Sequence, residues 1–201
     1  MGISFDKTKI SGSFPPFWRG DVKVLPGDFR IKQIFAEGTL LKAGTPIAVD
    51  FDNMECGVVK VAKVLAGGTT TIPRVSKGTL LKVGDIVAKV GKLDLSVSIT
   101  DISTANADYD VITLSGAMTT LATGDFLVES ATYAVGVTES APLYIANAVI
   151  ETTKEYTAKG FQTVSAGYDA LVLKEVVYPI PASWLTGFAL TNNQSIKYIK
   201  Q

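Results

Sequence analysis

The sequence predicts a mainly β protein, built as one or more short-stranded barrels or sandwich-like β domains with an extended N-terminal arm and little helix. Three observations lead to this prediction: a turn phrase that recurs, short β-branched runs that alternate with period two, and a weak helical pattern. The chain has 201 residues, of which 47% are hydrophobic and 19% are charged. It can therefore bury one substantial core or two smaller ones.

The recurring phrase is centred on Gly44, Gly84 and Gly124, which lie 40 residues apart. Residues 38–44 and 78–84 both read Gly-Thr-Leu-Leu-Lys-x-Gly, and the third copy is looser. An apolar step, a Gly-Thr or Gly-Asp pair and an apolar run indicate a tight turn between short strands. We expect positive φ at the three glycines. Because the units differ outside the phrase, it marks either a duplicated hairpin or one favoured turn used repeatedly.

Residues 1–20 are predicted to form an extended arm. This segment combines Ser, Gly and Pro with the large aromatic residues Phe14, Phe17 and Trp18. Exposed aromatic clusters usually serve as contact surface, so we expect these three residues and the adjacent Arg19 to contact a partner. The alternative is that the aromatic residues pack on the protein's own domain.

A β-rich core domain is predicted for residues 21–140. From Val22 to about Ser140 the chain reads as short apolar runs separated by Gly, Asp, Thr or Pro. The clearest runs are 58–64, 86–90, 95–100 and 109–114. The Ile72-Pro73 pair disfavours a central strand at that point, because proline lacks the backbone donor.

Residues 141–201 are predicted to form a C-terminal β segment with a short terminal helix, packed on the core. The stretch 144–156 contains good helix formers, but its β-branched pairs favour a strand. Residues 171–178 form the clearest late strand. A short helix is expected at 181–186, where a proline would occupy the first turn.

The formal net charge is zero, but the charges are segregated along the chain. From Cys56 to Lys92 there are seven basic residues against the single acid Asp85, whereas residues 93–153 contain eight acidic residues and no Lys or Arg. Such segments could meet between copies of the chain, or could simply be two solvated sets of loops. A neutral chain without aromatic residues among its basic ones disfavours nucleic-acid binding.

The sequence contains no recognisable catalytic or metal-binding pattern. It has no histidine and one cysteine, Cys56, which excludes an intrachain disulfide and the commonest general base. We interpret Cys56 as a core residue. Asp101, Asp108 and Asp110 surround Asn106 but lack EF-hand spacing, so we interpret them as loop caps. We therefore expect no enzyme activity, no cofactor and no metal site.

Membrane insertion and export are not expected. No apolar run reaches the roughly 18–20 residues that a membrane-spanning helix needs. The first residues, Met1-Gly2-Ile3-Ser4-Phe5, lack the charged and apolar regions of a secretory signal. We therefore expect synthesis in a cytoplasm and no membrane partner.

The chain also combines several features in a fixed order. A Pro-rich aromatic arm precedes the two Gly-Thr-Leu-Leu-Lys-x-Gly turns, and an acidic β stretch runs through Gly124-Asp125. A late apolar segment at 142–149 and a strand at 171–181 then lead to Trp184-Leu185 and the polar stretch 192–195. From about residue 30 to 200 this order resembles that of phage head-decoration and head-fibre base proteins, although no single motif is diagnostic.

The resemblance implies a mainly β protein, commonly trimeric, that binds the outside of an icosahedral capsid with the major capsid protein as its partner. We therefore expect a non-enzymatic virion protein on the capsid exterior, either a decoration protein or the base of a head fibre. The alternative is a stand-alone ligand- or glycan-binding β module, in which Trp18 or Trp184 and a nearby Tyr provide an aromatic face. A hydrolase is disfavoured, since histidine and a Gly-x-Ser-x-Gly elbow are missing.

Overall fold

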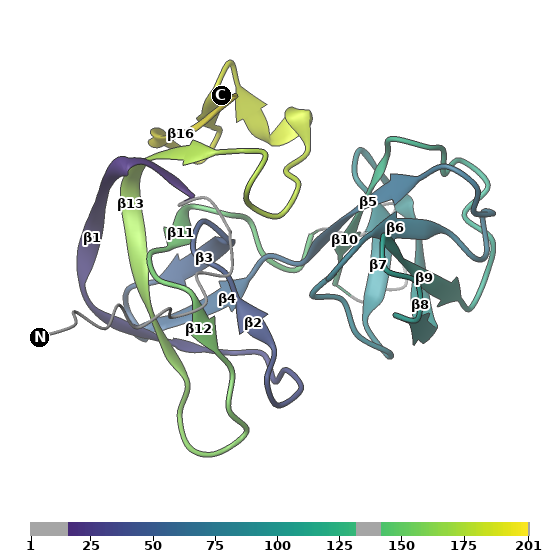
Figure 1. Cartoon of the computed structure of the whole chain (residues 1–201), viewed down its shortest axis with the longest axis horizontal. Helices are drawn as coiled ribbons and strands as arrows, with labels where there is room; N and C mark the ends of the chain where they lie inside the picture. Colours follow the sequence, from purple (N-terminus) through teal and green to yellow (C-terminus); the bar gives the residue numbers. More distant parts are fainter. Residues whose placement is uncertain (1–15, 132–141, 201) are drawn as a thin grey trace, which may run out of the picture.

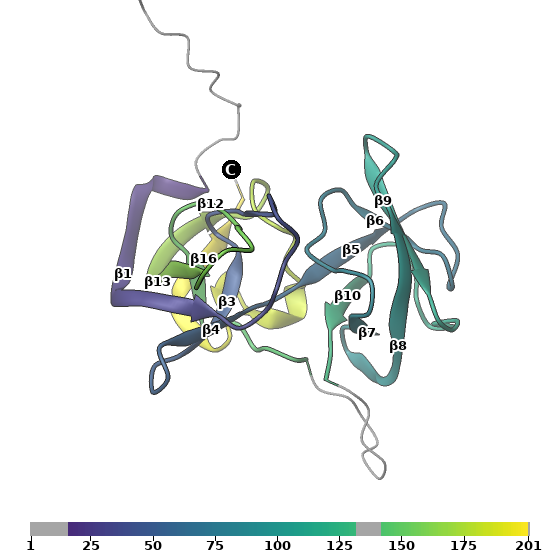
Figure 2. The ribbon, with the colours of Figure 1, turned by 90° about the horizontal axis from the view of Figure 1, so that it is seen from below.

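The computed structural model describes residues 16–131 and 142–200, and these residues form an almost purely β protein (Figure 1). Within them there are sixteen strands and one 3₁₀ helix, η1 (Ala182–Trp184). The strands form two closed or nearly closed units that lie side by side (Figure 2). The predicted fold class is therefore confirmed.

The first unit is built from both ends of the chain. Its strands are β1 (Phe17–Ile31), β2 (Leu40–Leu41), β3 (Pro46–Asp50), β4 (Glu55–Val58), β11 (Ala148–Ile150), β12 (Lys154–Glu155), β13 (Thr163–Leu173), β14 (Leu185–Thr186), β15 (Ala189–Leu190) and β16 (Asn193–Ile199). Because β1 pairs with both β4 and β13, the strands β1-β4-β3-β11-β13 close into a ring. Strands β16, β15 and β14 continue the sheet from β13, and β2 pairs separately with β12.

The second unit is a closed barrel inserted between β4 and β11. Its strands are β5 (Val61–Leu65), β6 (Arg74–Ser76), β7 (Ile86–Lys89), β8 (Lys92–Ser103), β9 (Tyr109–Leu114) and β10 (Phe126–Glu129). They pair in the order β10-β5-β6-β9-β8-β7. We call this unit the inserted barrel.

Strand pairing divides the chain differently from the three segments expected at 1–20, 21–140 and 141–201. The first unit combines strands from before and after the barrel in one sheet, so the boundary at 140 separates strands that pair. Residues 17–20 do not belong to an arm, because they lie in β1, where Phe17 pairs with Val172. Residues 1–15 lie outside the described part of the chain. Composition and periodicity predict strands, but they carry no information on which strands pair.

Most individual elements lie close to their expected positions. Strand β9 has the predicted bounds, 109–114, and η1 falls within the expected helix at 181–186. The stretch 144–156 contains β11 and β12, as predicted. The bounds predicted for the late strand, 171–178, were wrong, because β13 begins at Thr163 and ends at Leu173. A turn follows there, closed by a hydrogen bond from the Val176 N–H to the Leu173 carbonyl.

The described residues form three apolar cores. The first fills the ring of the first unit around Phe29 and Ile47, and the third fills the inserted barrel around Ile112. The second core lies on the β13–β16 side of the first unit and also contains Val61 and Val128 of the inserted barrel. The units therefore share buried apolar surface, which opposes independent movement.

The recurring phrase forms the same turn three times. Gly44, Gly84 and Gly124 have φ values of 81°, 91° and 92°, so the expected positive φ is confirmed. In each case the following residue donates its N–H at 3.1 Å to the carbonyl two residues before the glycine, as in a type II turn. The glycine N–H then donates to a carbonyl on an adjacent strand: Ile150, Ile99 and Val64 are the acceptors, at 2.7–2.9 Å.

Each of the three turns is followed by a strand of its own. They lead into β3, β7 and β10, one in the first unit and two in the inserted barrel. The acceptor residue returns its own N–H to the carbonyl of the residue after the glycine. The phrase is therefore a single hydrogen-bonded device used in both units.

Replacing Gly84 with Val should destabilise the protein by about 1–2 kcal/mol, because a β-carbon at positive φ is strained. Apart from the chain neighbours, no heavy atom of a described residue lies within 4 Å of the added Cβ, so backbone strain is the main cost. We expect the melting temperature to fall by roughly 2–8 °C in a thermal unfolding experiment.

The exposed neighbour Val83, replaced by Ala, serves as the control and should change the melting temperature little. Gly44→Ala should cost more than Gly84→Ala, since its Cβ would also collide with Val177. Equal melting temperatures for Gly84→Val and the wild type would contradict the strain assigned to this turn.

Candidate functional site

The chain crosses from the first unit to the inserted barrel through Lys60, and its side chain is fully buried. Its Nζ lies 2.7 Å from Asp85 Oδ2 and 2.8 Å from Glu129 Oε1. The ammonium also lies 5.6 Å from the centre of the Phe35 ring. We call Lys60, Asp85 and Glu129 the junction cluster.

Local structure positions both carboxylates. Asp85 follows the turn glycine Gly84, and its Oδ2 accepts the backbone N–H of Lys82 at 2.9 Å. Glu129 is the last residue of β10, and its Oε2 lies 3.4 Å from Gln33 Nε2 of the first unit. The Gln33 amide also donates to the Val58 carbonyl at 2.6 Å and accepts the Val58 N–H at 2.7 Å. The cluster thus joins both units by hydrogen bonds.

The cluster contains one ammonium and two carboxylates, a formal charge of −1 if all three are ionised. Burial raises the pKa of Glu129, and the hydrogen bond from Lys60 only partly opposes this. An excess carboxylate in a poorly solvated site is costly when ionised. The junction cluster is therefore a structural joint whose stability depends on Lys60.

The segregated charges meet within one chain. Lys77 pairs with Asp110 at 2.9 Å, and Lys89 pairs with Asp125 at 2.7 Å, in addition to the Lys60–Glu129 pair. Each pair joins the basic segment to the acidic one. The barrel thus brings the two segments together within one chain, an arrangement that differs from both contact between copies and separate solvated loops.

Asp110 has the loop-capping role expected for it. Its buried carboxylate accepts the N–H groups of Gly78 and Thr79 at 2.7 and 3.2 Å. Among the residues that the structure describes, no group of three or more acidic, Cys or His side chains could hold a metal ion. Cys56 is buried in the first core, and burial raises the pKa of its thiol to about 12, so it is a core residue as interpreted.

The predicted contact residues of the arm separate into different environments. Phe14 lies outside the described residues, and for Arg19 the structure describes only a place in β1. Phe17 is 6% exposed and belongs to the second core, so a partner-contact role for it is wrong. Trp18 is 37% exposed and remains a candidate contact residue.

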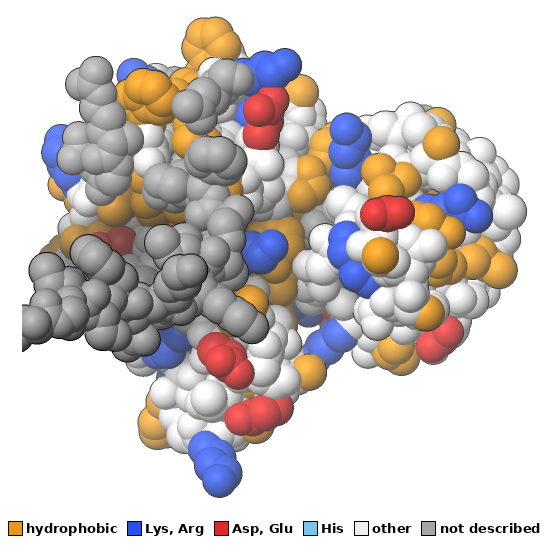
Figure 3. Space-filling model, viewed as in Figure 1, with side chains coloured by type: hydrophobic (Ala, Val, Ile, Leu, Met, Phe, Trp, Pro, Cys, Tyr) orange, Lys and Arg blue, Asp and Glu red, His pale blue; other side chains and the backbone are white. Residues whose placement is uncertain are grey.

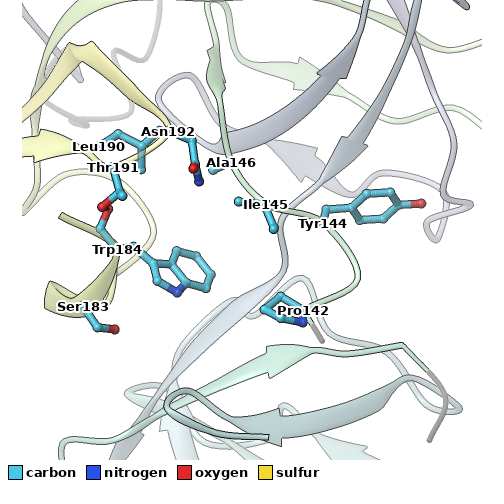
Figure 4. A pocket seen from close by; sticks show the side chains of 9 residues that line it. All are labelled: Pro142, Tyr144, Ile145, Ala146, Ser183, Trp184, Leu190, Thr191 and Asn192. Atoms are coloured by element: carbon cyan, nitrogen blue, oxygen red, sulfur yellow. The ribbon is translucent and has the colours of Figure 1, made fainter. Parts of the chain in front are cut away.

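A hollow of about 200 Å³ lies beside Trp184 (Figure 4). Its lining residues are Pro142, Tyr144, Ile145, Ala146, Ser183, Trp184, Leu190, Thr191 and Asn192. The indole points into the hollow toward Pro142 and Ile145, whereas the Tyr144 ring points away (Figure 4). We call this site the Trp184 hollow.

A second hollow, of about 290 Å³, shares Asn192 with the first. Its other lining residues are Leu25, Val49, Phe51, Asn147, Ala148, Tyr168 and Asn193. We call it the Tyr168 hollow. The sequence pointed to Trp184 as part of a possible aromatic face, but nothing in it indicated that these two sites adjoin.

The chain shows no significant match to any protein-family model, curated protein or solved structure. No helix in the described ranges 16–131 and 142–200 is long and apolar enough to cross a membrane.

Sequence reasoning missed the junction cluster. The only visible indication was Lys60 itself, a basic residue inside the apolar run Val58-Val59-Lys60-Val61. Period two places it on the face opposite to Val59 and Val61, so a solvated position was the natural interpretation. The strand connection at 59–60 interrupts this alternation and turns Lys60 inward.

Replacing Lys60 with Met should destabilise the protein by about 3–5 kcal/mol, because two buried carboxylates would then face each other without a cation. Urea denaturation measures this loss. Lys63→Met is the matched control: Lys63 is exposed on β5, and its replacement should change stability by less than about 0.5 kcal/mol. Similar stabilities for the two variants would refute the role of Lys60.

Glu129→Gln should become more stable relative to the wild type as the pH rises, whereas loss of an ordinary salt-bridge carboxylate lowers the relative stability as the pH rises. Because the folded-state pKa of Glu129 lies above its ordinary value of 4.5, its ionisation costs stability as the pH rises through that interval. The variant lacks this titration and leaves Lys60 paired with Asp85. Its stability relative to the wild type should therefore rise between acidic and neutral pH in urea titrations. A relative stability that falls over the same range would show that the ionised Glu129 is net stabilising.

Proposed function

We propose that the protein is a non-enzymatic structural component of a tailed-phage virion, bound to the capsid exterior as a decoration protein or as the base of a head fibre. It would self-associate, with a trimer favoured, and contact the major capsid protein. The resemblance in feature order suggests this class. The exposed apolar surface on the folded body is the structural observation that supports it.

The most distinct part of that surface lies on β1 and β13. Phe17 pairs with Val172, and both side chains are buried. The next residues along the two strands, Trp18 and Leu171, point the other way and are each 37% exposed. An outward Trp and an outward Leu on two paired strands are typical of a contact surface between proteins.

A second exposed apolar site spans the two units. Lys82 Nζ of the inserted barrel donates to the Ile34 carbonyl of the first unit at 3.0 Å. Ile34 and Val83 beside this bond are 71% and 56% exposed. Figure 3 shows hydrophobic side chains on the visible face of both units, among scattered Lys and Arg side chains. Contacts of modest area become effective when many copies bind one shell.

Substitutions of the adjacent residues Phe17 and Trp18 allow an effect on folding to be distinguished from an effect on binding. Phe17→Ala should lower stability by about 3–5 kcal/mol, because it opens a cavity in the second core. Trp18→Ala should leave the melting temperature nearly unchanged but reduce co-sedimentation with shells of the phage that encodes the chain.

Light scattering of the wild-type chain, measured separately, gives the number of copies in the oligomer, for which we expect three. Failure of the wild type to co-sediment with shells would overturn the proposed function. If the wild type binds and Trp18→Ala binds equally well, the β1–β13 face is not the contact surface.

A further inference from the structure

We propose that the Trp184 hollow and the Tyr168 hollow together form a binding site for a neutral oligosaccharide. Both hollows have Asn192 in their lining, so an extended ligand that passes Asn192 would contact both. This inference concerns a ligand site on the first unit and does not rest on the proposed attachment to a capsid.

The described residues that line the two hollows are all uncharged. Within the ranges 16–131 and 142–200, no lining residue of either hollow is Asp, Glu, Lys, Arg or His, in a chain where 19% of residues are charged. A phosphate, a carboxylate or a cation in such a site would lose its hydration without gaining a charged partner. The site is therefore suited to an uncharged ligand.

Each hollow combines an aromatic wall with polar groups. Trp184 forms a wall of the first hollow beside Ser183 and Asn192, and Tyr168 and Phe51 line the second. An aromatic face binds apolar C–H surface, while hydroxyl and amide groups bind the edges of a polyol. A sugar ring offers both kinds of surface, and successive rings of an oligosaccharide offer them repeatedly.

The amide groups around the site differ in their availability. Asn147 is used internally, since its Oδ1 accepts the Val49 N–H and its Nδ2 donates to the Val49 carbonyl. Asn193 Nδ2 donates to the carbonyls of Asn147 and Tyr168 at 2.8 and 2.9 Å. The Asn192 side chain, by contrast, is exposed and makes no hydrogen bond to the described residues. It is the free amide at the point where the hollows meet.

The walls are held in place without a ligand. Trp184 closes the helix η1, and its carbonyl accepts both the N–H and the hydroxyl of Thr191 at 2.9 Å. The bonds of Asn147 and Asn193 tie β3, β13 and β16 together under the Tyr168 hollow. A preformed site loses little conformational entropy when it binds.

A second copy of the chain is the competing occupant. Phe188, at the tip of the β14–β15 hairpin, is 72% exposed and could enter the Trp184 hollow of a neighbour. An apolar side chain there would bury the Ser183 hydroxyl and the Asn192 amide without partners, which costs free energy. The polar rim favours the oligosaccharide.

The test applies the full-length chain to an array of neutral and acidic glycans and measures the best neutral hexasaccharide by calorimetry. We expect binding to neutral glycans. Asn192→Ala, an exposed change that should not affect folding, should weaken binding by about tenfold through loss of its hydrogen bonds. Trp184→Ala should abolish binding, and Phe161→Ala, which removes an exposed aromatic ring outside both hollows, should bind like the wild type.

Three outcomes would overturn the proposal. The first is a lack of binding to any neutral glycan, and the second is binding only to acidic glycans. The third is binding that both Asn192→Ala and Trp184→Ala retain in full. If Phe188→Ala or Asn192→Ala lowers the oligomer mass in light scattering while no glycan binds, the hollow holds a second copy instead.

Discussion

The arrangement of the two units depends on one buried ammonium. Lys60 is placed at the crossing between them, and its charge is tolerated only because Asp85, which follows the Gly84 turn, and Glu129 of β10 both reach it. Asp85 is itself oriented by the type II turn at Gly84. A local backbone feature of the recurring phrase thus determines a tertiary contact, and the shared second core adds apolar burial around it. Charged and apolar contributions act at the same joint.

Local features could be predicted from the sequence, and long-range ones could not. Positive φ at Gly84, the strand at 109–114 and the 3₁₀ turn near Trp184 follow from the preferences of neighbouring residues. The pairing of Phe17 with Val172 does not, because its register is set by packing across more than 150 intervening residues. For the same reason, Phe17 and Trp18 looked alike in the sequence but face opposite sides of β1.

The candidate site illustrates the same limit. Trp184 could be recognised as a residue suited to an aromatic face, but Tyr168, Asn192 and Phe51 meet near it only through the β3–β11–β13–β16 arrangement. The internal bonding of Asn147 and Asn193, and the freedom of Asn192, are properties of the folded chain alone. In sequence, all three are simply polar residues of a late segment.

The insertion of the barrel between β4 and β11 has a consequence for biosynthesis. As the chain leaves the ribosome, β1 must wait for β13 before the first ring can close, whereas residues 61–129 hold every strand of the inserted barrel. Contacts distant in sequence form late, since more loop entropy must be lost. The barrel is therefore expected to fold first, during translation, and to bring the two halves of the outer unit close together.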